Sequence, residues 1–184
     1  QPDLNPFIAL DAEAARAAAK AADQVPESDR VGPLHGVPLA HKDMFYRAGR
    51  ISTCGSMIRR DVVADRTATV LSRLDAAGAL DLGTLSMAEF AAGATGHNLT
   101  FGDCLNPWDT AHTPGGSSTG SAVGLAARMF YGALGSDTGG SVRLPAYFCG
   151  VAGLRPTYGR ISRFGIMPRS WSADAVGPLA RSVR

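Results

Sequence analysis

The chain has 184 residues, of which 45% are hydrophobic and 18% are charged. This composition predicts a globular domain with a buried core and excludes a disordered tail. Its formal net charge is only +2, without a basic stripe, which argues against nucleic acid or a membrane surface as the main partner. No apolar run approaches the roughly 18 residues that span a bilayer, and no leader pattern opens the chain, so a cytoplasmic protein is expected.

The first elements predict an alternation of strand, helix and strand. Residues 7–10 form a short apolar run, and Asp11 then caps an alanine-rich helix that continues to Ala22. After a loop with proline and glycine, residues 36–41 are typical of a strand. Because proline cannot donate a ladder hydrogen bond, Pro38 indicates that this strand lies at a sheet edge or that Pro38 is near the start of the strand.

The middle of the chain continues the alternation. Residues 67–77 carry apolar side chains at helical spacing, with Gly78 as the expected cap, and residues 79–82 predict a buried strand. A short helix is expected over 86–91. Residues 93–116 are rich in Gly, Asn, Pro and Thr and are expected to form a loop.

The last elements complete an α/β pattern. A helix is predicted over 118–129, a strand over 131–134 and a further short helix from Val142. Residues 176–184 resemble a strand that is cut off at its end, which indicates a fragment of a longer chain. Strands that alternate with helices predict an α/β layer with at least some parallel pairing in one domain, residues 1–184.

Two turns rich in glycine and serine are the strongest functional signal. They span residues 114–121 and 137–143 and place Ser117 and Ser141 on separate turns. Ordering several glycines is costly, so such turns indicate backbone amides that must point at a ligand. A serine beside each turn makes acyl transfer the first chemistry to consider.

Histidine is the usual base for such a serine, but its position here is unfavourable. Residues 116–120 match G-x-S-x-G with Ser118 at the centre, and that nucleophile elbow requires a histidine later in the chain. A phosphate loop is also disfavoured, because Gly120 stands where its lysine would be. All four histidines precede both turns: His35, His41, His97 and His112.

Lysine is the alternative base. Of the 18 basic residues, all are arginine except two lysines, Lys20 and Lys42. Lys20 is expected to be solvated, whereas Lys42 follows a buried strand beside Asp43. A lysine base needs its pKa lowered from about 10.4 to near 7, or about 4.6 kcal/mol of bias against the ammonium form. The structural alternative is that Lys42 simply pairs with Asp43 or caps the end of a strand.

Four blocks in this order resemble the amidase signature family. They are Gly32-Pro-Leu-His-Gly-Val-Pro-Leu-Ala-His-Lys-Asp43, Gly115-Gly-Ser-Ser-Thr-Gly-Ser121, Ser136-Asp-Thr-Gly-Gly-Ser-Val-Arg-Leu-Pro-Ala146 and Cys149-Gly-Val-Ala-Gly-Leu-Arg-Pro-Thr-Tyr-Gly159. The resemblance covers nearly the whole chain. It implies the fold of that family, a mixed β-sheet core flanked by helices on both faces, incomplete here at the C-terminus.

The resemblance also implies a Ser-cisSer-Lys triad. Ser141 would be the nucleophile, Ser117 the bridging serine after a cis Gly116–Ser117 peptide, and Lys42 the base. The expected activity is hydrolysis of a small-molecule carboxamide through an acyl-enzyme, without cofactor or metal. The backbone amides of the second turn would form the oxyanion hole, namely those of Thr138, Gly139, Gly140 and Ser141.

Three positions depart from the family pattern. Thr119 replaces a usual glycine or serine, and Met44 and Leu144 stand where amidotransferase A subunits usually carry Asn and Gln. Met44 and Leu144 favour a stand-alone amidase. Such an enzyme could also form a homodimer. The alternative is the glutamine-hydrolysing A subunit of a tRNA amidotransferase, which needs partner subunits to receive ammonia. A third hypothesis is an inactive, truncated chain that acts as a binding module.

Several other conspicuous residues are expected to be structural. Asp137 and Arg143 are expected to brace the second turn, and Ser118 and Ser121 to cap or pack the following helix. His41 is expected to be packed or hydrogen-bonded. The cysteines form no CxxC pair and are expected to be inert thiols; they are Cys54, Cys104 and Cys149. Trp108 and Trp171 are expected in the core or at its rim.

Overall fold

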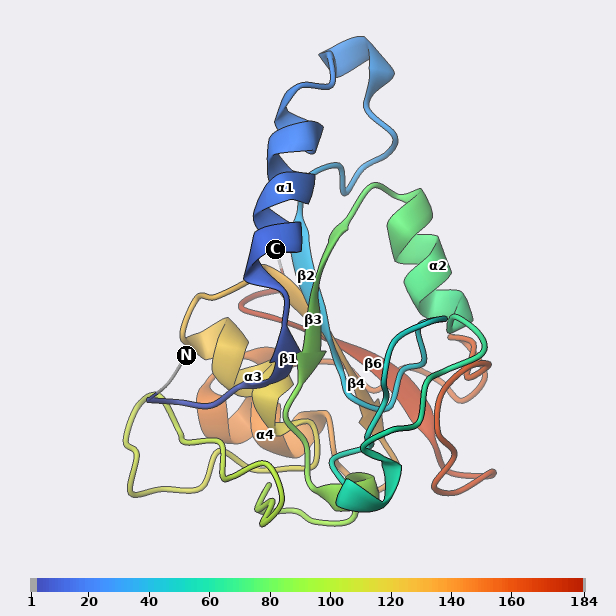
Figure 1. The fold of residues 1–184 in the computed structure, drawn as a ribbon. Coiled ribbons are helices and arrows are strands. Elements are labelled where there is room, and N and C mark those ends of the chain that lie inside the picture. Colours follow the sequence, from blue (N-terminus) through green and yellow to red (C-terminus); the bar gives the residue numbers. More distant parts are fainter. Residues whose placement is uncertain (1–2, 184) are drawn as a thin grey trace.

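A six-stranded mixed sheet forms the centre of the molecule, and helices lie on both of its faces (Figure 1). The structure, a computed structural model, describes residues 3–183. The strand order is β1-β3-β2-β4-β6-β5, with β2 parallel to both β3 and β4 and the other pairs antiparallel. The predicted α/β class with some parallel pairing and helices on both faces is therefore confirmed.

The first two elements form as their sequence predicts. Strand β1 spans Phe7–Leu10 and helix α1 spans Ala12–Asp23. The Asp11 side chain accepts a hydrogen bond from the Ala14 amide at 2.9 Å, which satisfies one of the free donors at the start of the helix. Lys20 lies on this helix and is exposed, as expected.

Strand β2, Pro38–Lys42, occupies the interior of the sheet between β3 and β4. Pro38 is its first residue, so the expectation of a position near the strand start is confirmed and that of a sheet edge is wrong. A first residue tolerates proline because its missing N–H interrupts no ladder bond further along the strand. The strand ends at Lys42.

The predicted elements of the middle region are present with shifted ends. Helix α2 spans Thr69–Ala76 and β3 spans Leu80–Leu85, three residues further than the apolar run indicated. The helix expected over 86–91 is only a 3-10 turn, Glu89–Ala91. Phe90 and Ala91 have positive φ there, which an α-helix does not permit.

The C-terminal half shows similar differences. Helix α3, Thr119–Ala126, stops before the predicted end at Met129, because Arg128 takes a φ of 60°. Strand β4 runs over Gly132–Asp137 and therefore continues past the predicted end at Leu134. The remaining elements are α4, Arg143–Cys149; β5, Ala152–Gly153; and β6, Ala175–Ala180.

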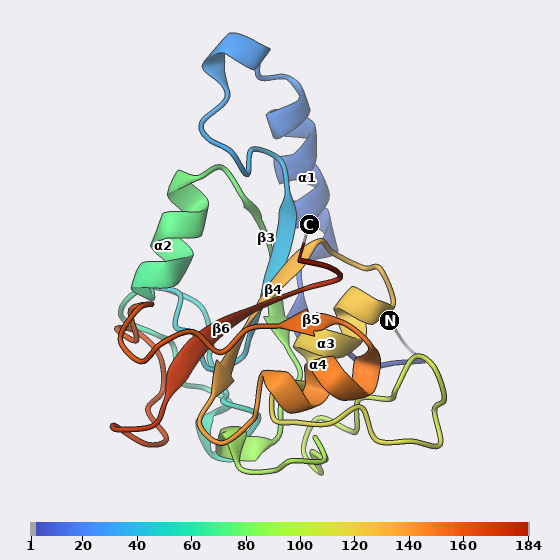
Figure 2. The same cartoon turned by 180° about the vertical axis from the view of Figure 1, so that it is seen from behind.

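Two hydrophobic clusters fill the two faces of the sheet. Helices α3 and α4 pack over one face, while α2 and the segment after β2 pack over the other (Figure 2). Because successive side chains of a strand point to opposite faces, Ala133 of β4 joins the first cluster and Leu134 joins the second. No helix within residues 3–183 is long and apolar enough to cross a membrane.

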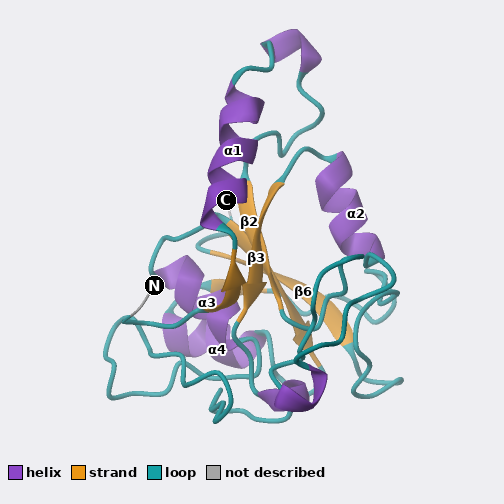
Figure 3. Cartoon of the chain, viewed as in Figure 1, coloured by secondary structure: helices purple, strands orange, loops and turns teal. Residues whose placement is uncertain are grey.

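The parallel strands carry the functional residues at one end. Lys42, Leu85 and Asp137 are the last residues of β2, β3 and β4. Long loops gather at this end of the sheet (Figure 3). In an open α/β sheet the carboxyl ends of the strands are where ligands usually bind, so this end is where a site is expected.

Candidate active site

Lys42 is fully buried at the end of β2 and bonds to two serines. Its Nζ donates to Ser117 Oγ at 2.6 Å and to Ser136 Oγ at 2.9 Å. Burial lowers the pKa of Lys42 from 10.5 to about 7, and the nearby charge of Arg169 acts in the same direction. The structure shows no pairing of Lys42 with Asp43, so the expectation of that ion pair is wrong, while Lys42 does lie at the end of a strand.

Asp43 points instead into the loop that follows β2. Its Oδ2 accepts hydrogen bonds from the Thr53 amide and hydroxyl. Burial raises the pKa of Asp43 to about 6, although the hydrogen bonds from Thr53 and neighbouring amides act against the rise. The carboxylate therefore anchors the loop and leaves the Lys42 amine to the serines.

The first glycine turn brings Ser117 to Lys42. The Gly116–Ser117 peptide is cis, as the resemblance implies. A Cβ on Gly116 would lie 2.7 Å from the Gly93 carbonyl oxygen and from the Gly96 amide nitrogen. Only glycine therefore fits here, and the turn is packed so closely that the Ser117 hydroxyl has a fixed position.

The second glycine turn carries Ser141 and is attached to the first. The Ser118 amide donates to the Ser141 carbonyl at 3.1 Å, so the two turns are neighbours. Ser141 retains 8% exposure, whereas Ser117 and Lys42 have none. Ser141 is therefore the one of these three residues that a substrate can reach.

Asp137 holds the second turn in shape. Its carboxylate accepts from the amides of Gly140 and Val142 and from two nitrogens of Arg143, all within 3.1 Å. Burial opposes its ionisation, but these hydrogen bonds prevail and lower the pKa of Asp137 to about 2. The expectation that Asp137 and Arg143 brace the turn is confirmed.

The backbone amides of the turn are not equivalent. The Gly140 amide is occupied by Asp137 at 2.8 Å. Gly139 is exposed and has no hydrogen-bond partner among residues 3–183. The Thr138 hydroxyl donates to Asp174 Oδ1 at 2.6 Å. Of the glycine amides proposed for the oxyanion hole, that of Gly139 is the one open to a ligand.

Ser136 and Arg155 are functional-site residues that sequence reasoning missed. Ser136 Oγ accepts from Lys42 and in turn donates to Met44 Sδ at 3.0 Å. Arg155 donates to the Asp137 carbonyl and, at 2.9 Å, to the Ala173 carbonyl. Both lie inside the four sequence blocks that carry the family resemblance, and the position of Ser136 close to the second glycine turn was the available signal.

The nucleophile elbow at Ser118 does not form. Ser118 is fully buried, and its hydroxyl donates to the Ser136 carbonyl at 3.3 Å. Ser118 is the N-cap residue of α3, as predicted, but its side chain makes no capping hydrogen bond. Ser121 packs as expected, and its hydroxyl donates a hydrogen bond to the Leu134 carbonyl.

The comparison with known families agrees with this geometry. The model of the amidase family matches residues 1–184. The chain belongs to the amidase family. Its curated relatives are longer: the A subunit of the glutamyl-tRNA(Gln) amidotransferase of Bordetella avium is 51% identical over 98% of this chain, but the match covers 36% of that relative.

Several solved structures have the same fold. The peptide amidase of Stenotrophomonas maltophilia is 40% identical with a TM-score of 0.91, over 99% of this chain and 38% of its own. A protein from a vestigial complex linked to the origin of an s-triazine catabolic enzyme is 46% identical with a TM-score of 0.93, over 98% of this chain and 40% of its own. This chain thus spans less than half of the length of these relatives.

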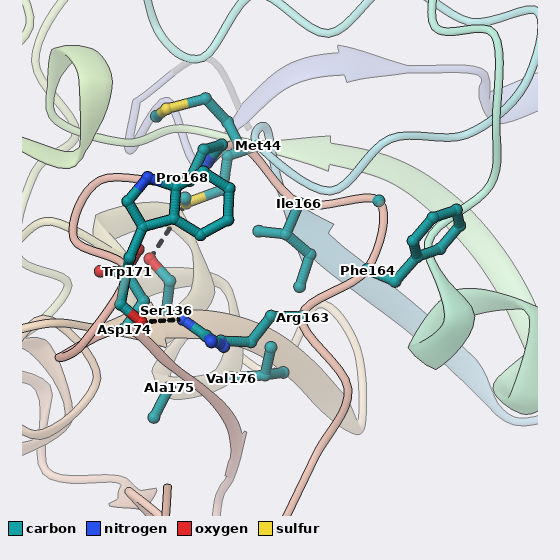
Figure 4. Close-up of a pocket in the computed structure, with 12 residues that line it drawn as sticks. Met44, Ser136, Arg163, Phe164, Ile166, Pro168, Trp171, Asp174, Ala175 and Val176 are labelled. Carbon is teal, nitrogen blue, oxygen red and sulfur yellow. Dashed lines mark hydrogen bonds between the residues drawn. The ribbon is translucent and has the colours of Figure 1, made fainter. Parts of the chain in front are cut away.

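A cavity of about 390 Å³ opens beside the Lys42 network of this chain (Figure 4). Ser136 and Met44 form one wall, so the cavity reaches the residue that bonds to Lys42. The segment before β6 forms the other wall with Arg163, Phe164, Ile166, Met167, Pro168, Trp171 and Asp174. Trp171 is thus an exposed rim residue, and Trp108 is also largely exposed.

Other reactive side chains play no part in this arrangement. His41 is buried against Phe45, as expected for a packed histidine. The three cysteines are free and buried, and burial raises the pKa of each thiol, which confirms the expectation of inert thiols. Within the described residues no group of three or more His, Cys, Asp or Glu could hold a metal ion.

Proposed function

We propose that this chain contains the catalytic centre of an amidase that hydrolyses a carboxamide through an acyl-enzyme on Ser141. The observation that carries the proposal is the 2.6 Å bond from the fully buried Lys42 amine to Ser117 Oγ. A pKa near 7 leaves a large fraction of Lys42 neutral at physiological pH, as a general base requires.

In this mechanism Ser117 relays a proton between Ser141 and Lys42. As Ser141 Oγ attacks the substrate carbonyl, its proton passes to Ser117 Oγ, and the Ser117 proton passes to the Lys42 amine. The relay then runs backward and protonates the leaving ammonia or amine as the C–N bond breaks. Water attacks the acyl-enzyme in the second half, with Lys42 and Ser117 again accepting its proton.

The oxyanion is proposed to form against the second turn. The amides of Thr138, Gly139 and Ser141 are the candidates, because the Gly140 amide already donates to Asp137. Each such donor is typically worth about 3 to 4 kcal/mol in the transition state. Asp137, with its bonds from Arg143 and Gly140, would keep this turn fixed during the reaction.

A fluorophosphonate probe tests the nucleophile directly. We expect labelling at Ser141, found by peptide mapping, and its loss in Ser141→Ala, with labelling strongly slowed in Lys42→Ala and Ser117→Ala. Turnover of small amides should fall by about a thousandfold or more in each variant. Ser28→Ala, on the exposed 3-10 turn after α1, is the matched control. Labelling at Ser118 would support the elbow instead, and no labelling together with no turnover would support a binding module.

The second candidate is the A subunit of a glutamyl-tRNA(Gln) amidotransferase. It is favoured by the 51% identity to the subunit of that name from Bordetella avium. Met44 and Leu144 disfavour it, and Met44 lies at the cavity wall where its sulfur accepts from Ser136. Glutamine hydrolysis that rises on addition of the partner subunits would support this candidate, whereas hydrolysis of simple amides without partners supports the stand-alone amidase.

A further inference from the structure

Met44 contributes the last hydrogen-bond acceptor in the network of Lys42. The Lys42 amine donates to Ser136 Oγ at 2.9 Å, and Ser136 Oγ lies 3.0 Å from Met44 Sδ. A thioether sulfur carries no proton, so Ser136 is the donor in this second contact. A serine hydroxyl has only one proton. Because that proton lies on the sulfur, Ser136 can act toward Lys42 only as an acceptor.

The Met44 side chain is held in position for this contact. It is 2% exposed and belongs to the hydrophobic cluster on the face of the sheet that α2 covers. The Met44 amide donates to the Lys42 carbonyl at 2.7 Å, and the Met44 carbonyl accepts from the Met167 amide at 3.0 Å. Figure 4 shows the bond from Ser136 to the sulfur as a dashed line. Within residues 3–183 the Ser136 hydroxyl donates to this sulfur alone.

The direction of the Ser136 hydroxyl decides what the electron pair of the Lys42 amine faces. A neutral amine has a single electron pair, and only this pair can accept a proton. Lys42 Nζ lies 2.6 Å from Ser117 Oγ and 2.9 Å from Ser136 Oγ, so both hydroxyls are close enough to donate to it. Because Ser136 donates to the sulfur instead, an N–H group of Lys42 faces Ser136 and the electron pair is left to Ser117.

We propose that Met44 is a positioning residue for the proton relay: its sulfur keeps Ser136 as an acceptor and thereby directs the electron pair of Lys42 at Ser117. Met44 is neutral and acts through hydrogen bonds alone. The ionisable groups whose charges act on Lys42 lie on other residues and stay in place when Met44 is replaced: Arg169, Asp137, Asp174 and Cys54. The effect of Met44 on labelling and turnover rests on the proposed function, whereas its effect on the protonation of Lys42 does not.

Leucine and asparagine at position 44 separate the acceptor from the bulk of the side chain. Met44→Leu puts a methyl carbon at the same bond distance from Cβ as Sδ, so it keeps an apolar side chain of similar volume and removes the acceptor. Met44→Asn puts a carbonyl oxygen there, which is a stronger acceptor than a thioether. In Met44→Leu the Ser136 proton turns to Lys42 Nζ, occupies its electron pair and stabilises the neutral amine. Met87→Leu, the same change in the same hydrophobic cluster, is the control.

Protonation of Lys42 is measured first, without turnover. The sequence contains only two lysines, Lys20 and Lys42, so NMR of protein labelled with carbon-13 at lysine Cε gives few signals. The signal that is missing from Lys42→Met belongs to Lys42. We expect its proton affinity to fall about 3- to 10-fold in Met44→Leu, the range that one hydrogen bond provides, and to keep the wild-type value in Met44→Asn and Met87→Leu. An unchanged titration of Lys42 in Met44→Leu would overturn the proposal.

Fluorophosphonate labelling of Ser141 is then followed from neutral to alkaline pH. At high pH, where Lys42 is neutral, the labelling rate should be about 10-fold lower in Met44→Leu and unchanged in Met44→Asn and Met87→Leu. In a Ser136→Ala background Met44→Leu should have no further effect, because the residue through which it acts is absent. Equal losses in both backgrounds would contradict the role of Met44. The expected change in Lys42 titration, in a protein whose Ser141 is never labelled, would uphold that role and refute the proposed function.

Discussion

Replacement of Lys42 by methionine should abolish catalysis and yet stabilise the protein near neutral pH. Methionine has a similar length and no charge, so it fits the buried position without requiring a proton to be removed. In the wild-type protein the folded state holds Lys42 with a pKa of about 7, whereas the unfolded chain has the ordinary value of 10.5. Near neutral pH, folding therefore costs the free energy needed to remove the proton from Lys42 or to bury its charge.

The size and sign of this effect follow from proton linkage. Below pH 7 the full cost applies and amounts to about 5 kcal/mol. Between pH 7 and 10.5 the unfolded chain binds the proton and the folded protein does not, so wild-type stability rises by about 1.4 kcal/mol per pH unit. Because the folded lysine is half protonated at pH 7, the advantage of Lys42→Met should shrink by about 2.3 kcal/mol from pH 7 to pH 9. Loss of the bonds to Ser117 and Ser136 reduces the advantage by an amount that does not depend on pH.

Urea unfolding of both proteins at pH 7, 8 and 9 measures the difference directly. Comparing wild type with variant at each pH cancels the other titrating groups, and equal m-values would show that the same transition is followed. A stability difference that stays constant over this range would mean that Lys42 keeps its proton on folding. That result would refute the neutral lysine on which the proposed relay depends.

Three further predictions address the Lys42 network and the two turns. Ser136→Ala removes one of the two acceptors of Lys42, so kcat should fall by about 10-fold with little change in KM, as steady-state kinetics would reveal. Asp137→Asn should lose about 2 kcal/mol of stability above pH 4, because the folded pKa of Asp137, about 2, lies below the ordinary 3.8. This loss of stability should vanish as the pH falls to 2. Acid titration of both proteins, followed by circular dichroism, tests this, and a loss that persists at pH 2 would contradict it. Gly116→Ala places a Cβ 2.7 Å from two backbone atoms, so we expect at least a hundredfold loss of probe labelling at Ser141, and retained labelling would contradict the packed turn.

Local signals predicted most of the secondary structure but misplaced several ends. Hydrophobic runs located β1, β2 and β3, and Asp11 located the start of α1, since these depend on residues close in sequence. The end of α3 was wrong because it depends on backbone conformation at Arg128, which no propensity indicates. Strand β4 continued to Asp137 because its pairing with β6 runs that far, and pairing partners are distant in sequence.

The candidate site was predictable only in its residue types. The scarcity of lysine and the two glycine turns indicated Lys42, Ser117 and Ser141, but their proximity depends on β2 lying beside β4, a pairing that periodicity does not reveal. Ser136 was missed because its role requires that pairing.

The surroundings of Lys42 explain how a buried lysine can stay neutral among several aspartates. A free carboxylate beside it would raise its pKa and trap the proton. Asp43 is instead bonded to Thr53, and Asp137 is covered by Arg143 and backbone amides. The hydroxyls that contact Lys42 carry no charge, so burial decides its protonation. Arg143 and Arg155 therefore do more than brace the turn, because their positive charges offset the charge of Asp137, which acts to raise the pKa of Lys42.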